Sequence, residues 1–325
     1  MKVLVTGAGA LLGQGILRAL QASSLNVELI AVDPSPLAAG LYWVDRAHRV
    51  PMARDPAYLD VLSEILGREE PDAVLIGTDV ELEVLASHRH ALEERFRTHI
   101  IVASPEVVAI ADDKYQTASF LLSRGFAAPL SGLPGEEERI LDAVGFPLVV
   151  KPRVGARSVG LSIVHDRAEL DRAVSSLADP VIQEHVATAD EEYTAGTLTF
   201  NGVCHASIVM RRDLRDGNTY RAFVEPWPEL NAQVSELATA LGAYGPANFQ
   251  FRLDGDTVKV FEINARFSGT TPLRHKAGFP EVEMVLRHVV LKEPITRPPV
   301  EPMTLLRHWS ETVVRPQERL AWDAR

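Results

Sequence analysis

The 325-residue sequence lacks several features that define common classes of protein. It contains one cysteine, Cys204, which excludes an internal disulfide and a zinc site built from several cysteines. It contains no Gly-Lys-Ser/Thr sequence, which excludes a P-loop nucleotide site. No apolar run is long enough to span a bilayer and no secretory leader opens the chain, so we expect a soluble, cytoplasmic protein.

Basic side chains are also comparatively few, with 33 Lys and Arg against 44 Asp and Glu and a net charge of −11. This charge disfavours general binding to nucleic acid or to an anionic membrane, but it permits a local basic pocket for nucleotide phosphates. Hydrophobic content of 46% and charged content of 24% are ordinary for a globular protein. The length is sufficient for two or three domains.

The first hundred residues alternate between apolar strands and helices. The segment KVLVTGAGALLGQGILRAL reads as a strand, a glycine turn and a helix, and VELIAVD reads as a strand that ends at Asp33. The alternation continues to Ser104 and predicts a parallel sheet covered by helices on both faces. Gly7, Gly9 and Gly13 are compatible with a dinucleotide site and equally with the packing of a tight turn.

The stretch from 248 to 267 predicts a β-hairpin, with strands over 247–253 and 257–263 around an Asp-Gly turn. Side chains on alternating positions of a strand share one face. Five polar residues occupy such positions: Asn248, Gln250, Glu262, Asn264 and Arg266. Carboxylate and amide oxygens suit Mg²⁺, and a guanidinium suits a phosphate or carboxylate. The hairpin therefore predicts a metal and anion site.

Two further segments are rich in basic or flexible residues. FPLVVKPRVGARSVGLSIV reads as two strands joined by a Gly/Arg/Ser loop, which is either a flap over phosphates or a hairpin that needs glycine. Arg211, Arg212 and Arg215 are predicted to lie in a loop after the strand GVCHASIVM. There Arg211 and Arg212 are either substrate contacts or solvated side chains.

Four segments in this order resemble motifs of the ATP-grasp superfamily, and within it the synthetase units of the carbamoyl-phosphate synthetase large chain and their short, single-unit relatives. The segments are DDKYQTASFLLSRGFAAP, FPLVVKPRVGARSVGLSIV, VIQEHV and FQF…VFEINARFSGTTP. The likeness covers nearly the whole chain. It implies an α/β, Rossmann-like pre-ATP-grasp domain over 1–104 that does not bind NAD. An α+β ATP-grasp fold follows, with a lid subdomain over 105–182 and a large subdomain over 183–325.

The resemblance also implies roles for individual residues. Metal ions, Mg²⁺ with Mn²⁺ as an alternative, are held by Gln250, Glu262 and Asn264. The phosphates of ATP are contacted by Lys114 and Lys151, under a flap that includes Gly155, Ser158 and Gly160. The adenine is met by Gln183 and by the backbone of Glu184, His185 and Val186. The catalytic set is Arg266, which stabilises an acyl phosphate, together with Lys151. Candidates for substrate recognition are Arg153, Arg157, Arg211, Arg212, Ser268 and Arg274.

Two positions depart from the pattern of the family. Gln250 stands where many relatives carry Glu; the carbamoyl-phosphate type also has Gln, and the metal site should then be less charged. Ala195-Gly196-Thr197 follows Glu192 where relatives often carry an acid that binds the ribose, so no residue is assigned to the ribose.

The implied function is that of an ATP-grasp carboxylate–amine ligase, which forms an acyl phosphate with Mg-ATP and releases ADP and phosphate. With one synthetase unit and no evident amidotransferase domain, the chain fits a small amino-acid or peptide-type ligase better than full carbamoyl-phosphate synthesis. The expected partners are a small-molecule carboxylate and an amine, without nucleic acid or membrane, and a homodimer is compatible.

Two alternatives stay open. The first is an NAD(P)-dependent oxidoreductase on the glycine-rich opening, against which none of the six tyrosines has Lys four residues later. The second is a non-catalytic ATP-binding regulatory protein on the same fold, because fold does not determine activity.

Overall fold

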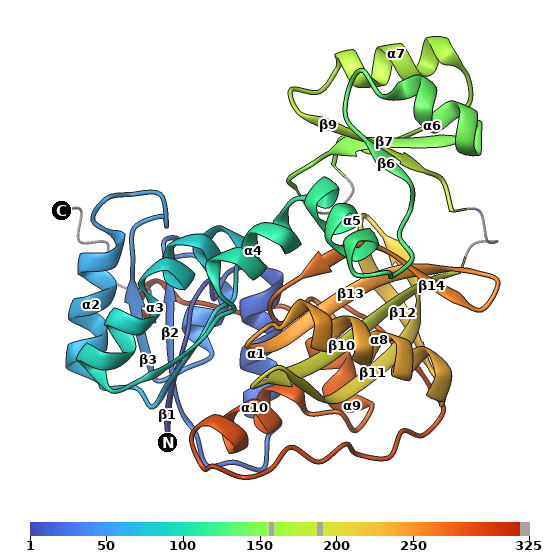
Figure 1. Cartoon of the computed structure of the whole chain (residues 1–325). Coiled ribbons are helices and arrows are strands. Elements are labelled where there is room, and N and C mark those ends of the chain that lie inside the picture. The colour runs from blue at the N-terminus through green and yellow to red at the C-terminus, as the bar shows by residue number, and fades with distance from the viewer. Residues whose placement is uncertain (156–158, 187–190, 319–325) are drawn as a thin grey trace.

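The computed structural model describes residues 1–155, 159–186 and 191–318, and three sheets organise them (Figure 1). A five-stranded parallel sheet lies near the N-terminus, a small four-stranded sheet forms a lid, and a six-stranded antiparallel sheet completes the chain. The expected fold, a Rossmann-like domain followed by two α+β ATP-grasp subdomains, is confirmed. Among the described residues, no helix combines the length and the apolar character that a membrane crossing requires.

The N-terminal sheet has the strand order β3-β2-β1-β4-β5 with every pair parallel, as the alternating pattern predicts. Its strands are β1 Lys2–Val5, β2 Glu28–Asp33, β3 Arg46–Arg49, β4 Ala73–Leu75 and β5 His99–Ile101. Its helices are α1 Leu11–Gln21, α2 Tyr58–Glu69 and α3 Leu82–Phe96, with short 3₁₀ segments η1 Ala39–Tyr42 and η2 Asp79–Glu81. Strand β3 was not anticipated, because its sequence RAHR has no apolar alternation.

The glycine-rich turn after β1 is closely packed. A Cβ atom on Gly13 would lie 2.1 Å from the carbonyl oxygen of Gly7. The Asp33 carboxylate already accepts hydrogen bonds from the backbone N–H groups of Gly9, at 2.7 Å, and Ser35, at 2.8 Å. Because the acid that would bind a dinucleotide ribose is used inside the turn, the structure favours the packing interpretation of these glycines.

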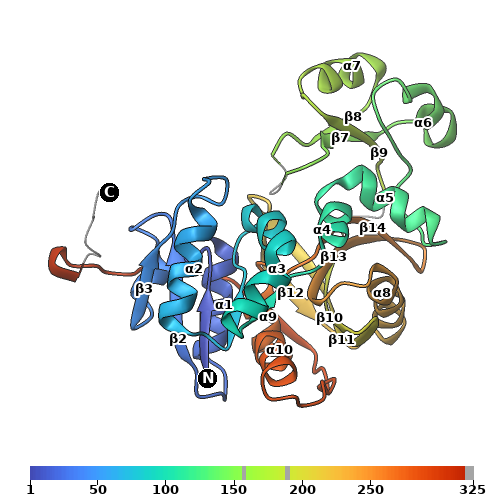
Figure 2. The same cartoon turned by 60° about the vertical axis from the view of Figure 1, so that its left-hand side comes forward.

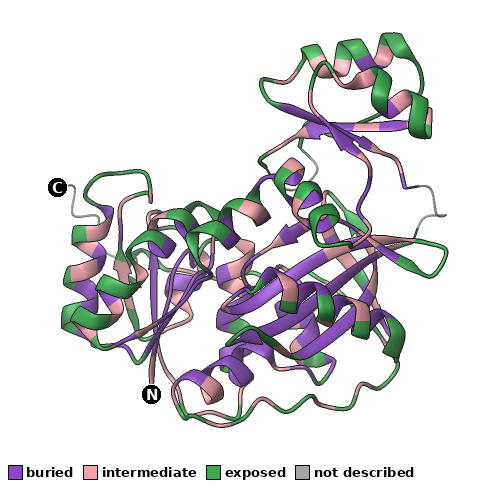
Figure 3. Cartoon of the chain, in the orientation of Figure 1, coloured by how far each residue is buried: buried purple, intermediate pink, exposed green. Residues whose placement is uncertain are grey.

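The lid has its own small core between its sheet and two helices (Figure 3). Its elements are β6 Ser131–Gly132, α6 Glu137–Val144, β7 Leu148–Pro152, β8 Ser162–Val164, α7 Arg167–Ser175 and β9 Pro180–Glu184. Leu148, Val150 and Ile182 come from the sheet and Ile140 and Leu170 from the helices. Outside this core the helices are largely exposed, so few apolar contacts hold the lid to the remainder of the chain.

Two helices connect the first sheet to the lid: α4 Pro105–Asp112 and α5 Lys114–Ser123. Ser104 caps α4, accepting a hydrogen bond from Val107 N–H, and Asp113 caps α5. Both helices contact the hairpin strand β14, and Val108 and Leu121 join the core that holds Phe249 and Phe251. This packing favours a lid that begins after α5. Helix α4 was not anticipated from the sequence.

The large sheet has the strand order β14-β13-β10-β11-β12-β15. Its strands are β10 Glu192–Phe200, β11 Val203–Arg215, β12 Asn218–Val224, β13 Gly245–Asp254, β14 Thr257–Asn264 and β15 Met303–Leu306. Its helices are α8 Pro228–Leu241, α9 Thr271–Lys276 and α10 Glu281–Val289, and a 3₁₀ turn, η3, covers Pro316–Glu318. The predicted arginine-rich loop is wrong: Arg211, Arg212 and Arg215 all lie in β11. They alternate between two faces of a strand that turns only at Asp216-Gly217.

The N-terminal domain is joined to the large subdomain through α9 and α10, which contact α1 (Figures 1 and 2). One core cluster contains Ile16 and Leu17 of α1 together with Phe279 and Val282. At its edge, the Glu283 carboxylate accepts hydrogen bonds from the serines at 23 and 24. The two units therefore present a shared surface on which a site can be built.

Candidate active site

The hairpin forms as predicted, and its register places the polar residues together. Gln250 is opposite Glu262, and Asn248 is opposite Asn264. The register then shifts, so that Phe251 pairs with Val260 and Phe261 is left over as a bulge. The bulge explains how Val260 and Ile263, which strict alternation would place on opposite faces, are both buried.

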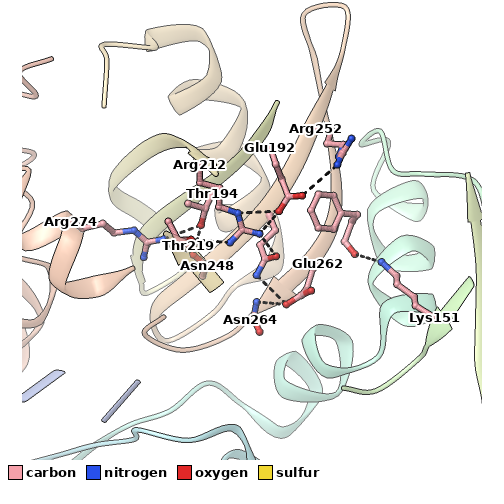
Figure 4. Close-up of polar contacts among 12 residues, drawn as sticks. Lys151, Glu192, Thr194, Arg212, Thr219, Asn248, Arg252, Glu262, Asn264 and Arg274 are labelled. Atoms are coloured by element: carbon pink, nitrogen blue, oxygen red, sulfur yellow. Dashed lines mark hydrogen bonds and ion pairs between the residues drawn. The ribbon is translucent and has the colours of Figure 1, made fainter. Parts of the chain in front are cut away.

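A continuous series of polar contacts crosses this face (Figure 4). Glu262 Oε1 accepts hydrogen bonds from Gln250 Nε2 at 3.1 Å and from Asn264 Nδ2 at 3.0 Å. Asn264 Oδ1 accepts one from Arg266 Nη2 at 2.8 Å, and Arg266 also pairs with Asp79 of the N-terminal domain at 2.6 Å. The structure thus brings Gln250, Glu262, Asn264 and Arg266 together.

These residues can be tested for their fit to a metal ion. In the described ranges no group of three or more His, Cys, Asp and Glu side chains converges. A cation here would meet the Glu262 carboxylate, toward which Gln250 and Asn264 turn their amide nitrogens. The amide oxygens of these two residues accept hydrogen bonds from Arg212 and Arg266, which they would exchange to bind a cation. Glu262 Oε2 makes no hydrogen bond to the described part of the chain and is free to bind a cation. Mg²⁺ commonly takes one or two carboxylates and completes its octahedron with waters and phosphate oxygens, which this set permits.

Lys114 and Lys151 line one cleft together with Gly155, Gln250 and Glu262. Lys151 Nζ lies 3.5 Å from the carbonyl oxygen of Phe261, and burial lowers the pKa of this lysine to about 8 even though the nearby Glu262 opposes the shift. Lys114 begins α5, and its Nζ donates to the carbonyl oxygen of Gly155 at 2.8 Å. The cleft therefore has two buried lysines beside Glu262, and Glu192 and Arg212 also line it.

The start of the flap is anchored to the same helix. Arg153 forms an ion pair with Asp113, the residue that caps α5, and lies 3.4 Å from Asp179. Its guanidinium is thus engaged within the protein, which weakens its candidacy as a substrate contact. Gly160 has a φ of +75°, a conformation that favours glycine. Arg157 and Ser158 lie outside the described residues.

The segment proposed for the adenine connects the lid to the hairpin. Gln183 Nε2 donates to Ser131 Oγ at 2.8 Å within the lid. Glu184 pairs with Lys259 of β14 at 2.8 Å, and the carbonyl oxygen of Val186 lies 3.5 Å from Arg252 Nη1. The His185 Nδ1 atom is buried without a hydrogen-bond partner in the described ranges. None of the four lines the cleft that holds the two lysines.

Glu192 is a site residue that the sequence reasoning did not identify. It opens β10 opposite Arg212, with which it forms a buried ion pair. Arg212 Nη2 also donates to Gln250 Oε1 at 2.6 Å, so the pair orients the hairpin amide. Arg211 points to the other face, where its guanidinium stacks on Phe223 at 3.9 Å from the ring centroid.

A second cleft lies between the N-terminal domain and the large sheet. It shares Arg212, Gln250 and Glu262 with the first cleft and adds Arg266 and Ser268. Both Ser268 and its hydrogen-bond partner Thr270 are buried, with hydroxyl oxygens 2.6 Å apart.

Arg274 lies beneath the second cleft and does not line it. Its side chain is 1% exposed, pairs with Glu281 at 3.2 Å and donates to Asn248 Oδ1, which gives Asn248 the structural role that the sequence could not supply. Gly196 makes this possible, because a Cβ atom there would lie 2.5 Å from the guanidinium.

Comparison with known proteins agrees with this architecture. Residues 3–100 match the family described as the PylC-like N-terminal domain, and residues 181–311 match ATP-grasp in the biosynthetic pathway with Ter operon. The chain is 26% identical to the carbamoyl phosphate synthase large chain of Haemophilus ducreyi over 311 residues, covering 85% of this chain and 28% of that one.

Two solved structures share the fold. N5-carboxyaminoimidazole synthetase from Staphylococcus aureus in complex with ADP has a TM-score of 0.74 and 15% identity, covering 94% of this chain and 81% of that one. L-amino acid ligase from Bacillus licheniformis has a TM-score of 0.69 and 20% identity, covering 89% and 74%. The chain therefore has the ATP-grasp fold, with a PylC-like N-terminal domain over residues 3–100 and an ATP-grasp match over residues 181–311.

Proposed function

We propose that the protein is a ligase that uses Mg-ATP to activate a carboxylate as an acyl phosphate and then joins it to an amine. One observation carries the proposal: two clefts meet at Gln250 and Glu262, one lined by Lys114 and Lys151 and the other by Arg266. Phosphoryl transfer needs a nucleotide and an acceptor in line on either side of a charge-neutralising centre. The shared wall of the two clefts has that position.

In the first cleft, the two lysines bind phosphate oxygens. To reach a phosphate, Lys114 exchanges its hydrogen bond to the carbonyl oxygen of Gly155, which couples nucleotide binding to the start of the flap. Glu262, with Gln250 and Asn264, would hold Mg²⁺, which neutralises phosphate charge when bound. The backbone of residues 184–186 and Gln183 are proposed for the adenine, and the staphylococcal relative in complex with ADP supports a nucleotide on this fold.

The reaction balances as two displacements. A carboxylate oxygen attacks the γ-phosphorus, the bond to the bridging β–γ oxygen breaks, and ADP leaves. The amine nitrogen then attacks the acyl carbon, a C–N bond forms, the C–O bond to phosphate breaks, and the amine loses a proton to solvent. Arg266, held by Asp79 and Asn264, is aimed at the charge that develops on the acyl phosphate.

The choice of an amine as nucleophile is supported by the fold shared with the L-amino acid ligase. The chain spans 28% of the carbamoyl phosphate synthase large chain that it resembles, so that enzyme's full reaction is not proposed. Use of NAD(P) at the N-terminal turn is disfavoured because Asp33 is already hydrogen-bonded to Gly9.

The test is ADP release over a panel of carboxylate and amine pairs, with mass spectrometry of the product. With the productive pair, Glu262→Gln should reduce the rate about 100-fold or more, because it removes the one carboxylate of the metal site. Glu236→Gln on the exposed side of α8 is the matched control and should retain full rate. ADP release that no amine accelerates would contradict the ligase, and full turnover by Glu262→Gln would contradict the metal assignment.

A further inference from the structure

The arginines around the second cleft differ in how their charge is compensated. Arg212 pairs with Glu192, and Arg266 pairs with Asp79. Arg307 is half-buried, and among the described residues its guanidinium donates only to the backbone carbonyl oxygen of Gly269. Within residues 1–155, 159–186 and 191–318, it forms no ion pair.

The absence of an ion pair at Arg307 within the described residues is unusual because its surroundings disfavour a positive charge. Burial lowers the pKa of its guanidinium, and the one charged neighbour that contributes, Arg18, acts in the same direction. Removing a charged group from water costs free energy unless an opposite charge compensates it. Arg307 is therefore a preformed site for an anion that the described chain does not supply.

The position of Arg307 is set by a sheet. It follows β15 directly, and its backbone N–H donates to the carbonyl oxygen of Tyr220 at 3.0 Å, which continues the pairing of β15 with β12. Its side chain lines both the second cleft and a third cleft. The third cleft has a mostly apolar surface that includes Leu11, Tyr220 and Trp309. The indole of Trp309 is 90% exposed.

We propose that Arg307 and the third cleft form the acceptor subsite of this enzyme, and that the acceptor is an α-amino acid with an aromatic side chain. The proposal rests on the proposed ligase function. The carboxylate of the amino acid binds the Arg307 guanidinium, and the aromatic ring of the amino acid lies in the third cleft against Tyr220 and Trp309. The amine then faces the second cleft, where Glu262 and Arg266 mark the acyl phosphate.

Charge and shape both favour this occupant. A carboxylate and a guanidinium form two parallel hydrogen bonds, and aromatic rings pack well against indole and phenol rings. Asp216 and Arg215 also line the third cleft and offset each other in charge, so Arg307 leaves one positive charge, which matches a singly charged carboxylate. The two features that single out this surface, an uncompensated guanidinium and an exposed indole, are each matched by one group of the amino acid.

The test compares three amine probes with the wild type and three variants. L-phenylalanine carries both groups, phenethylamine lacks the carboxylate, and L-alanine lacks the ring. Arg307→Gln should raise the KM for L-phenylalanine about 10- to 100-fold, because a charge-assisted hydrogen bond is lost, and leave phenethylamine and ATP unchanged. Trp309→Ala, at an exposed side chain that folding does not depend on, should raise the KM for L-phenylalanine and not for L-alanine. Arg211→Gln, which lines none of the three clefts, is the matched control.

Calorimetric binding of L-phenylalanine to the wild type and to Arg307→Gln gives a readout independent of turnover. Binding lost in Arg307→Gln supports the subsite even where no amine accelerates ADP release, a result that overturns the ligase alone. Amine-dependent ADP release that is identical in Arg307→Gln and Arg211→Gln overturns the subsite and leaves the ligase standing. Equal KM values for L-phenylalanine and phenethylamine in the wild type also overturn it.

Discussion

Replacing Lys151 by an uncharged residue should raise the stability of the nucleotide-free protein and weaken nucleotide binding. Burial lowers its pKa from an ordinary value of 10.5 to about 8, so at pH 7 the nucleotide-free protein holds a protonated amine against that cost. This lowering of the Lys151 pKa corresponds to about 3 kcal/mol, which is an upper limit on the free energy of unfolding that the protein loses by keeping this charge buried. Replacement by an uncharged side chain of similar length, Lys151→Met, should therefore raise the free energy of unfolding of the nucleotide-free protein.

The assay is thermal unfolding with and without Mg-ATP. Lys151→Met should unfold several degrees above the wild type without nucleotide and lose the rise that ATP gives to the wild type. Lys114→Met is the contrasting control. The Nζ of Lys114 donates to the carbonyl oxygens of Gly155 and Arg153 at 2.8 and 3.3 Å, so its loss should destabilise the nucleotide-free protein by about 1–3 kcal/mol. A lower Tm for nucleotide-free Lys151→Met, or a retained ATP response, would refute the reasoning.

The lowered pKa of Lys151 also makes the free energy of unfolding and the affinity for ATP depend on pH. Between about pH 8 and 10.5 the folded chain has lost the Lys151 proton while the unfolded chain keeps it, so the unfolded state binds more protons and the stability rises with pH. The difference in Tm between Lys151→Met and the wild type should narrow across that window. Above pH 8, ATP binding has to restore the proton, and the apparent ATP affinity should fall about tenfold per pH unit.

Three further changes have a defined direction. Burial raises the pKa of Glu81 to about 7, so the folded chain keeps a proton that the unfolded chain loses near pH 4.5. The free energy of unfolding should therefore fall between pH 4.5 and 7. Urea unfolding above pH 7 should show that Glu81→Gln is more stable than the wild type. Gly196→Ala places a methyl group 2.5 Å from Arg274 and should cost about 1–3 kcal/mol or more in urea unfolding, whereas Gly67→Ala, 3.4 Å from its nearest neighbour, should not. Gln250→Glu adds a second carboxylate and should lower the Mg²⁺ concentration for half-maximal ADP release; an unchanged requirement would argue against a metal at this position.

The hairpin could be predicted because both of its signals are local. An Asp-Gly turn determines the pairing of its arms, and the pairing determines which side chains share a face. Spacing from the turn alone would place Gln250 opposite Phe261, and the one-residue bulge moves Glu262 into that position. The bulge at Phe261 could not be predicted, because it depends on how the following residues pack against the core.

Contacts between distant segments were beyond the reach of the sequence. Asn248 had no evident role because its partner, Arg274, belongs to a helix on the far side of the site. A run of arginines predicts a loop because charged residues are usually exposed, whereas Arg212 lies in β11 and is buried by its pairing with Glu192. Strand β15 is short and exposed, so only its pairing with β12 identifies it.

The distribution of compensated and uncompensated charges reconciles an acidic chain with an anion-binding site. Arg212 and Arg266 each have a carboxylate partner within the chain, so their charges are already compensated before a ligand binds. Within the described part of the chain, Lys114, Lys151 and Arg307 form no ion pair. Buried charges are stable only when they are compensated, so these three groups indicate where ligand anions bind. Two adjacent lysines then correspond to phosphates and the separate arginine to a carboxylate, which places nucleotide and acceptor on opposite sides of Glu262.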